Sequence, residues 1–162
     1  MIEWAKRPVE EANLINPAYC SLLIATVAQG YESEEKELPF SVSFLILPMV
    51  LHPFTRNRLP RTTKTSIPVW LKNNPDILLG FSKRVKAMVP YTKEALLFGL
   101  KHNLIIHGRG HQILSNGEIS LSYDSPRSED VKECLKIAGF IGRWFAKGGS
   151  ENLLYALFGI KP

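Results

Sequence analysis

A chain of 162 residues fits one domain with its own hydrophobic core and is too short for two. Hydrophobic residues make up 45% of the chain and charged residues 22%, a globular composition that excludes general disorder. The longest apolar run, residues 40–51, is too short to span a bilayer, and the first residues lack the apolar core of an export signal. We therefore expect a single domain over residues 1–162 that is cytoplasmic and has no membrane partner.

The net charge of +5 is unevenly distributed along the chain. Residues 1–37 contain seven acids and three bases, residues 38–117 two acids and eleven bases, and residues 118–162 six of each, so the segments carry −4, +9 and 0. The basic middle segment favours binding to a polyanion or to an acidic protein surface. The alternative is an ordinary solvated surface, which the acidic first segment balances in space.

The first predicted helix is central and buried. The pair Asn16-Pro17 is typical of a helix cap and first helical residue, and Gly30 is a stop signal, so the helix should cover residues 17–29. Apolar residues occupy nearly all of its faces, which is the pattern of a helix in the middle of a core.

The next two stretches predict a helix and a loop. Residues 40–51 favour a short helix that is kinked or ends near Pro48. Residues 52–65 contain two prolines and four basic side chains, and they predict an exposed basic loop.

Three helices are predicted in the rest of the basic segment. Ser66 should cap a short helix that ends at Asn73. A second helix should run over residues 75–89 until Pro90 stops it, and a third over residues 92–103.

Short strands should follow these helices. Residues 104–106, 112–114 and 118–121 are apolar stretches separated by glycine-containing turns. Helix, turn, helix and hairpin is the order of a winged helix-turn-helix. The expected fold class is thus mainly α (α+β): a helical domain with a winged helix-turn-helix-like core and a small β hairpin or meander.

Two helices should complete the chain. Ser128, followed by two acidic residues, should cap a long helix that ends at Gly148-Gly149. Ser150 should cap a final helix that ends at Gly159.

Six blocks follow one another almost from end to end of the sequence: Trp4–Cys20, Leu38–Phe40, Leu47–His52, Val89–Leu100, Gly142–Gly148 and Leu157–Pro162. Together these blocks resemble the middle component of bacterial three-component ABC systems. Proteins of this family are small subunits encoded with an SMC-like or RecN-like ABC ATPase and a variable third protein.

The resemblance implies a non-catalytic adaptor with a role in antiphage defence, which links the SMC-like ATPase to an effector protein. It brings no catalytic motif to this chain. Small winged-helix adaptors beside the ATPases of related defence systems are an analogy at the level of fold alone.

The sequence contains no local signature that predicts catalysis or a cofactor. His102, His107 and His111 favour a surface turn over a metal site, because no cysteine and only Glu118 accompanies them there. Lys147-Gly-Gly-Ser150 favours a turn between helices over a phosphate site, because no strand precedes it. Cys20 and Cys134 lie in apolar helical patterns and should be buried free thiols, as in a reducing compartment.

Two sets of candidate binding residues remain. Basic side chains that could contact phosphates of double-stranded DNA without sequence specificity are Arg56, Arg58, Arg61, Lys64, Lys83, Arg84, Lys86, Lys93, Lys101 and Arg109. Candidates for the partner interface are Trp4, Arg143, Trp144, Phe145 and Phe158. For each aromatic residue taken alone, packing in the core is the favoured alternative. A free-standing winged-helix transcriptional regulator is the alternative function; the predicted third helix offers few long polar side chains to read bases.

Overall fold

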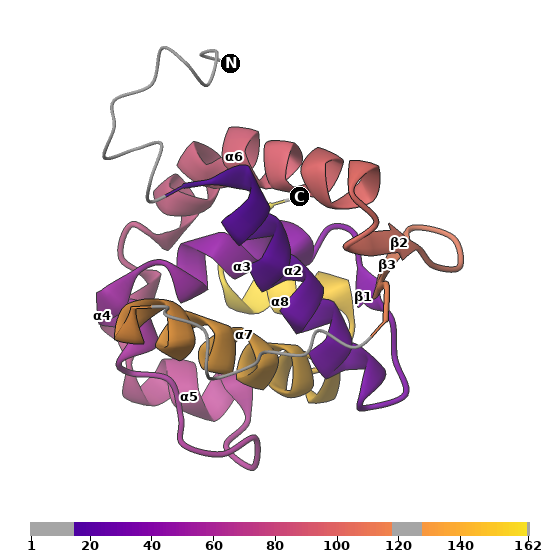
Figure 1. Cartoon of the computed structure of the whole chain (residues 1–162). Coiled ribbons are helices and arrows are strands. Elements are labelled where there is room, and N and C mark those ends of the chain that lie inside the picture. The colour runs from indigo at the N-terminus through magenta and orange to yellow at the C-terminus, as the bar shows by residue number, and fades with distance from the viewer. Residues whose placement is uncertain (1–14, 118–127, 162) are drawn as a thin grey trace.

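The computed structural model describes residues 15–117 and 128–161. It is mainly α-helical with a small antiparallel sheet, as expected (Figure 1). The helices are α2 (Pro17–Glu32), α3 (Ser43–Val50), α4 (Pro53–Arg56), α5 (Ile67–Asn73), α6 (Phe81–Lys101), α7 (Glu129–Lys147) and α8 (Glu151–Leu157), with a 3-10 turn η2 (Pro75–Leu78). The strands are β1 (Leu38–Pro39), β2 (Ile105–His107) and β3 (Gln112–Ser115).

Helix α2 lies at the centre of the fold, as its apolar composition predicts. It packs against α3, α6 and α7, and the side chain of Asn16 caps it by accepting from the amide of Ala18 at 2.9 Å. The predicted stop at Gly30 is wrong, because the helix continues to Glu32. Gly30 is instead where α2 touches α7: a Cβ there would lie 2.8 Å from the carbonyl oxygen of Gly139.

The stretch from α3 to α4 departs from expectation at the start of the predicted loop. Helix α3 passes through Pro48 and ends at Val50. The predicted exposed loop over residues 52–65 instead begins with the short helix α4, and Arg56 at its end is buried. The expectation of exposure is therefore wrong for Thr55 and Arg56.

Helix α6 is continuous through Pro90, so the predicted helix end at this proline is wrong. Pro90 lies on the exposed side of α6, where water can satisfy the carbonyl that loses its amide partner. The helix also begins later than predicted, because residues 75–78 form the separate turn η2. A winged helix-turn-helix is not confirmed, because the second and third predicted helices are parts of one continuous helix, α6.

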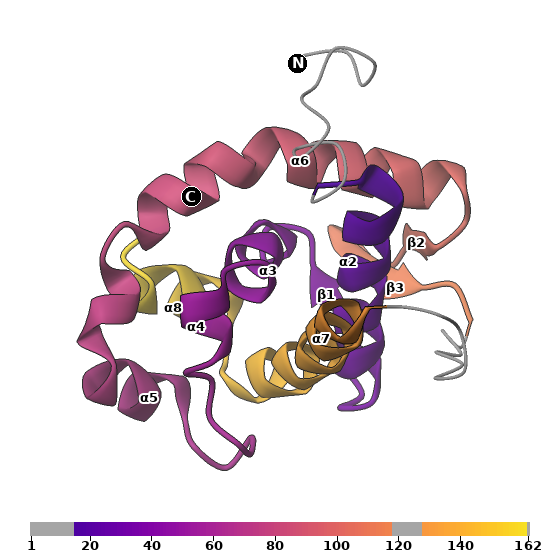
Figure 2. The ribbon, with the colours of Figure 1, turned by 60° about the vertical axis from the view of Figure 1, so that its left-hand side comes forward.

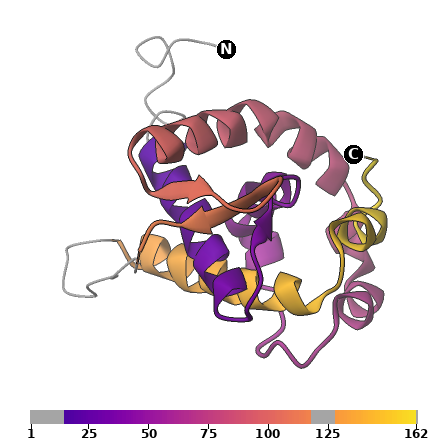
Figure 3. The same ribbon diagram turned by 90° about the vertical axis from the view of Figure 1, so that its right-hand side faces the viewer.

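The sheet has the strand order β1-β3-β2 (Figure 3). Strands β2 and β3 form the predicted hairpin, with Ile105 opposite Ser115 and His107 opposite Ile113. Strand β1 adds a short third strand that the sequence analysis did not predict, with Leu38 opposite Ile113. The predicted strand over 118–121 lies outside the described residues.

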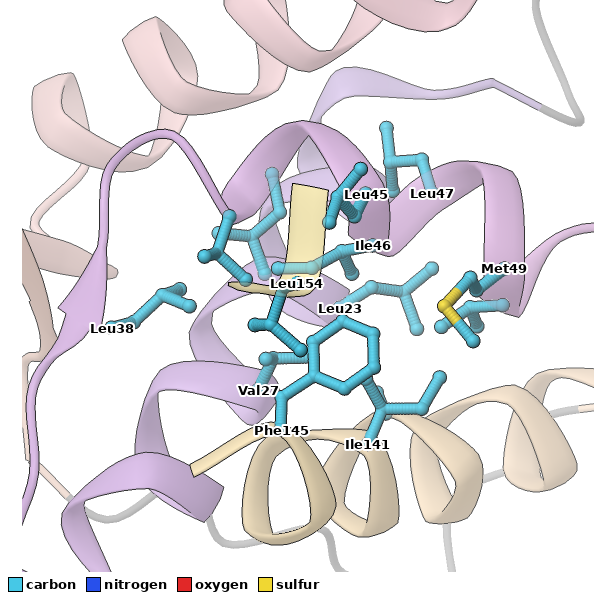
Figure 4. Close-up of a cluster of buried hydrophobic side chains, with 14 of the residues drawn as sticks. Leu23, Val27, Leu38, Leu45, Ile46, Leu47, Met49, Ile141, Phe145 and Leu154 are labelled. Carbon is cyan, nitrogen blue, oxygen red and sulfur yellow. The ribbon is translucent and has the colours of Figure 1, made fainter. Parts of the chain in front are cut away.

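The two C-terminal helices are confirmed with their caps. Ser128 accepts from the amide of Val131 at the start of α7, and Ser150 accepts from the amide of Leu153 at the start of α8, each at 3.3 Å. The core lies between these helices and α2, α3 and β1 (Figure 4). The labelled side chains are Leu23, Val27, Leu38, Leu45, Ile46, Leu47, Met49, Ile141, Phe145 and Leu154.

Candidate functional site

A cavity of about 740 Å³ opens between α2, α3, α6 and the first turn of α7, and we call it the groove. Figure 2 shows the elements around it, with α6 passing over α3 and α4. The groove is lined by Ile15, Asn16, Tyr19, Leu47, Pro48, Leu51, His52, Pro53, Arg56, Arg84, Ala87, Met88, Ser128, Asp130 and Val131. Most of these residues are apolar, and the charged ones lie at the end near α4.

Arg56 is the charged residue that the groove holds most firmly. Its guanidinium donates to the carbonyl of Val50 at 3.1 Å and to the sulfur of Cys134 at 3.0 Å. It also pairs with the carboxylate of Asp130, and Glu133 lies 3.6 Å away. Arg56 thereby joins α4 to α7. The carboxylate of Asp130 is exposed, and it is already paired within the chain.

Arg84 shares the same end of the groove but lacks such partners. Its guanidinium donates to the hydroxyl of Thr55 at 3.3 Å and lies 5.4 Å from the ring centre of Phe81. Among the described residues no carboxylate lies within ion-pair distance of it, and its Nε atom is buried without a hydrogen-bond partner. Burial lowers the pKa of this guanidinium.

His52 caps α4 beside Arg84. Its Nδ1 accepts from the backbone amide of Thr55 at 3.3 Å and lies 2.9 Å from the hydroxyl of the same residue. Burial, together with the nearby Arg84 charge, lowers the pKa of His52. The neutral form of the His52 imidazole is therefore favoured in the folded protein.

The predicted DNA-contacting residues fall into three groups. Arg56 is buried, and Arg84 is half-buried in the groove. Arg58 is exposed but pairs with Asp76 at 2.7 Å and lies over the ring of Phe54. The remaining candidates are exposed: Arg61, Lys64, Lys83, Lys86, Lys93, Lys101 and Arg109.

Three of the predicted interface residues lie in the core. Trp144, Phe145 and Phe158 are 1%, 0% and 2% exposed, so their position favours the core alternative. The indole of Trp144 donates to the carbonyl of Thr65 at 2.7 Å and packs edge-on against Trp70. Arg143 is exposed on α7, and Trp4 lies outside the described residues.

The other motifs lie away from the groove. His102, His107 and His111 are exposed at the end of α6 and in the hairpin. In the described parts of the chain no three histidine, cysteine or acidic side chains are close enough to share a metal ion. The segment Lys147–Ser150 forms the predicted turn between α7 and α8.

Both cysteines are buried free thiols, as predicted. Burial raises the pKa of the Cys20 thiol to about 12, and burial also raises the pKa of Cys134. In the regions that the structure describes, no helix is both long and apolar enough to cross a membrane.

The groove could not be predicted from the sequence. Its walls come from residues 15–19, 47–56, 84–88 and 128–131, which no local pattern brings together. One signal was present: Arg84 falls off the apolar face of its predicted helix, next to Met88, which lies on it.

The fold and groove together define a small helical protein with a largely apolar groove that has two guanidinium groups at one end. Comparison with protein families then places the chain: the model of ABC-three component (ABC-3C) system Middle Component 3 matches residues 4–162. The chain therefore belongs to the family of ABC-three component system middle components, as the resemblance indicated. Searches of curated proteins and of solved structures found no significant match.

Proposed function

We propose that this protein is a non-catalytic adaptor, which links the ABC ATPase of its three-component system to the effector protein of that system in antiphage defence. The observation that carries the proposal is the family match over residues 4–162. A middle component without chemistry of its own acts by binding others, and binding requires a surface that its own core does not use.

The structure supports this role with such a surface. The aromatic residues Trp144, Phe145 and Phe158 are buried in the core. The groove, in contrast, leaves apolar side chains and Arg84 accessible. Concave, largely apolar surfaces with a few polar groups are typical binding sites.

Co-expression with the other two components tests the proposal. We expect the chain to co-elute with the ATPase in size-exclusion chromatography at micromolar concentration, and to bring the third component into the same peak. The chain alone should hydrolyse no nucleotide. Separate elution of all three proteins, or ATP hydrolysis by this chain alone, would contradict the adaptor function.

A second contact, with double-stranded DNA, is supported by a row of lysines on α6. Lys83, Lys86, Lys93 and Lys101 are all exposed, and their spacing places them on one side of the helix. With a rise of about 1.5 Å per residue the row is about 27 Å long, which suits phosphates along a duplex. The alternative of a free-standing winged-helix regulator lacks its second helix, because α6 is continuous.

Salt dependence of DNA binding tests the lysine row. Replacing Lys83, Lys86 and Lys93 with glutamine should weaken binding to unrelated duplexes equally and reduce the slope of affinity against salt by about 0.9 per lost contact. The matched control replaces Lys72, Lys136 and Lys161, which are exposed outside α6 and carry the same total charge. Equal loss in both variants would contradict a specific role for the row.

A further inference from the structure

The groove contains a charge that the described protein leaves without a counter-charge. Among the described residues of its lining, Asp130 is the only acidic one, and Arg56 already binds it. Arg84 contributes a second guanidinium with no carboxylate in range among the described residues. Arg56 is therefore compensated by Asp130 and Glu133, whereas Arg84 has no counter-charge among the described residues.

Several features of the groove favour an anion. The Nε atom of Arg84 is buried and donates to nothing in the described structure. The N-terminus of helix α2 also borders the groove, since Asn16 lies in its lining, and no acidic residue lies in the first turn of this helix. It adds a partial positive charge to the groove. A carboxylate that pairs with Arg84 would supply the counter-charge that the described residues lack.

The rest of the groove favours apolar side chains. Leu51, Met88 and Val131 are half-buried in its lining, and Ala87 is exposed at its edge. Methionine adapts to differently shaped partners and is frequent in grooves that receive helices. A volume of about 740 Å³ has room for several side chains.

We propose that the groove is the docking site for an amphipathic segment of another component of the three-component system, whose apolar side chains fill the groove while a carboxylate pairs with Arg84. This deepens the adaptor function and rests on it. A guanidinium and a carboxylate can form two parallel hydrogen bonds, which fixes the register of the bound segment. Arg84 thus selects the partner, and the apolar walls supply most of the buried surface.

Photo-crosslinking in the assembled complex identifies what lies in the groove. The photoreactive amino acid p-benzoylphenylalanine replaces Ala87 in the full chain, which is co-expressed with the other two components, and mass spectrometry locates the cross-link. We expect a cross-link to a segment of a partner that contains apolar and acidic residues. The same replacement at Lys136, exposed on α7 outside the groove, is the control and should not reach that segment.

The outcomes separate the two proposals. A complex that forms while the probe at Ala87 reaches only residues 1–14 of its own chain, a second copy, or nothing overturns the groove and leaves the adaptor intact. If no complex forms, the adaptor function fails and the groove proposal fails with it.

Arg84→Gln tests the charge pairing. Affinity for the partner that the cross-link identifies should fall roughly 30-fold or more, as expected when one member of a buried charge pair is removed. Lys136→Gln removes the same charge from an exposed site and should leave affinity unchanged. Thermal unfolding of Arg84→Gln should match or exceed that of the parent chain, because the variant removes a half-buried cation that the described structure does not pair. Unchanged affinity, or a loss of affinity accompanied by a lower melting temperature, would overturn the proposed pairing.

Discussion

Helices α2 and α7 are in close contact at one place along their lengths and border an open groove at another. Where they cross, backbone meets backbone: a Cβ on Gly142 would overlap the carbonyl oxygen of Val27, and Gly30 faces Gly139. Near their first turns the same helices diverge, and the groove opens beside Tyr19 and Val131.

This difference separates the part of the molecule that stabilises it from the part that is free to bind. At Gly30 and Gly142 the crossing has no room for a Cβ atom, so the interactions there are complete within the chain. The groove leaves apolar side chains half-buried and one guanidinium without a carboxylate among the described residues. Substitutions at the crossing should therefore change stability, and substitutions in the groove should mainly change binding.

The largest effect should come from Trp144, at the packed end of α7. Trp144→Ala removes a ring that is 1% exposed and also the hydrogen bond from its indole to Thr65. We expect the free energy of unfolding to fall by about 3 to 5 kcal/mol, measured by chemical denaturation. Trp144→Phe keeps an aromatic ring there and should cost less. A fully stable Trp144→Ala variant that has lost partner binding would instead make this residue an interface anchor.

Gly142→Ala tests the crossing itself. The added methyl group meets the backbone of α2, which cannot move without shifting the helix, so we expect a loss of about 1 to 3 kcal/mol in the free energy of unfolding. Gly139→Ala is the matched control on the same helix. Its Cβ would have ordinary contacts of 3.6 and 3.8 Å, and the better helix propensity of alanine should raise stability by up to about 1 kcal/mol. Equal effects of the two substitutions would mean that the helices are not in close contact.

Arg56 lies in the groove, but its substitution should change stability, as substitutions at the crossing do. Arg56→Met removes the donor to the carbonyl of Val50 and the partner of Asp130, and should cost about 1 to 3 kcal/mol in unfolding free energy. The exposed pair of Lys132 with Glu129 provides the comparison, since Lys132→Met should change stability by about 0.5 kcal/mol or less. If the two variants lose the same amount, burial of Arg56 contributes nothing beyond a surface ion pair.

Local sequence signals predicted the parts of the fold that are determined locally. The caps at Asn16, Ser128 and Ser150 follow from hydrogen bonds within two or three residues, and all three are present. The hairpin likewise follows from glycine-containing turns between short apolar runs.

Contacts between distant residues decided what the sequence could not show. Arg56 looked like part of an exposed basic loop because its partner Asp130 is 74 residues away. Pro90 was expected to end a helix, yet it lies on the exposed side of α6, where the lost hydrogen bond costs least. The groove has no local signature, because four separated segments form it.

The smallest effect should be a pH dependence that arises at His52, in the lining of the groove. Its pKa is lowered in the folded protein because of burial and the nearby Arg84, whereas in the unfolded chain it has its ordinary value of 6.5. The unfolded state then binds more protons, so stability should rise with pH. The contribution is complete above about pH 6.5 and is lost as the pH falls through the lower, folded pKa.

Chemical denaturation at pH 7.5 and pH 5.5 measures this dependence. His52→Asn keeps a side chain that can cap α4 but does not titrate, so its stability should fall less between the two pH values than that of the parent chain. We expect a difference of less than about 1 kcal/mol, because His52 is only partly buried. His107→Gln, at an exposed strand position, should retain the full pH dependence. An identical pH dependence in His52→Asn and the parent chain would show that protons bind His52 equally well in the folded and unfolded states.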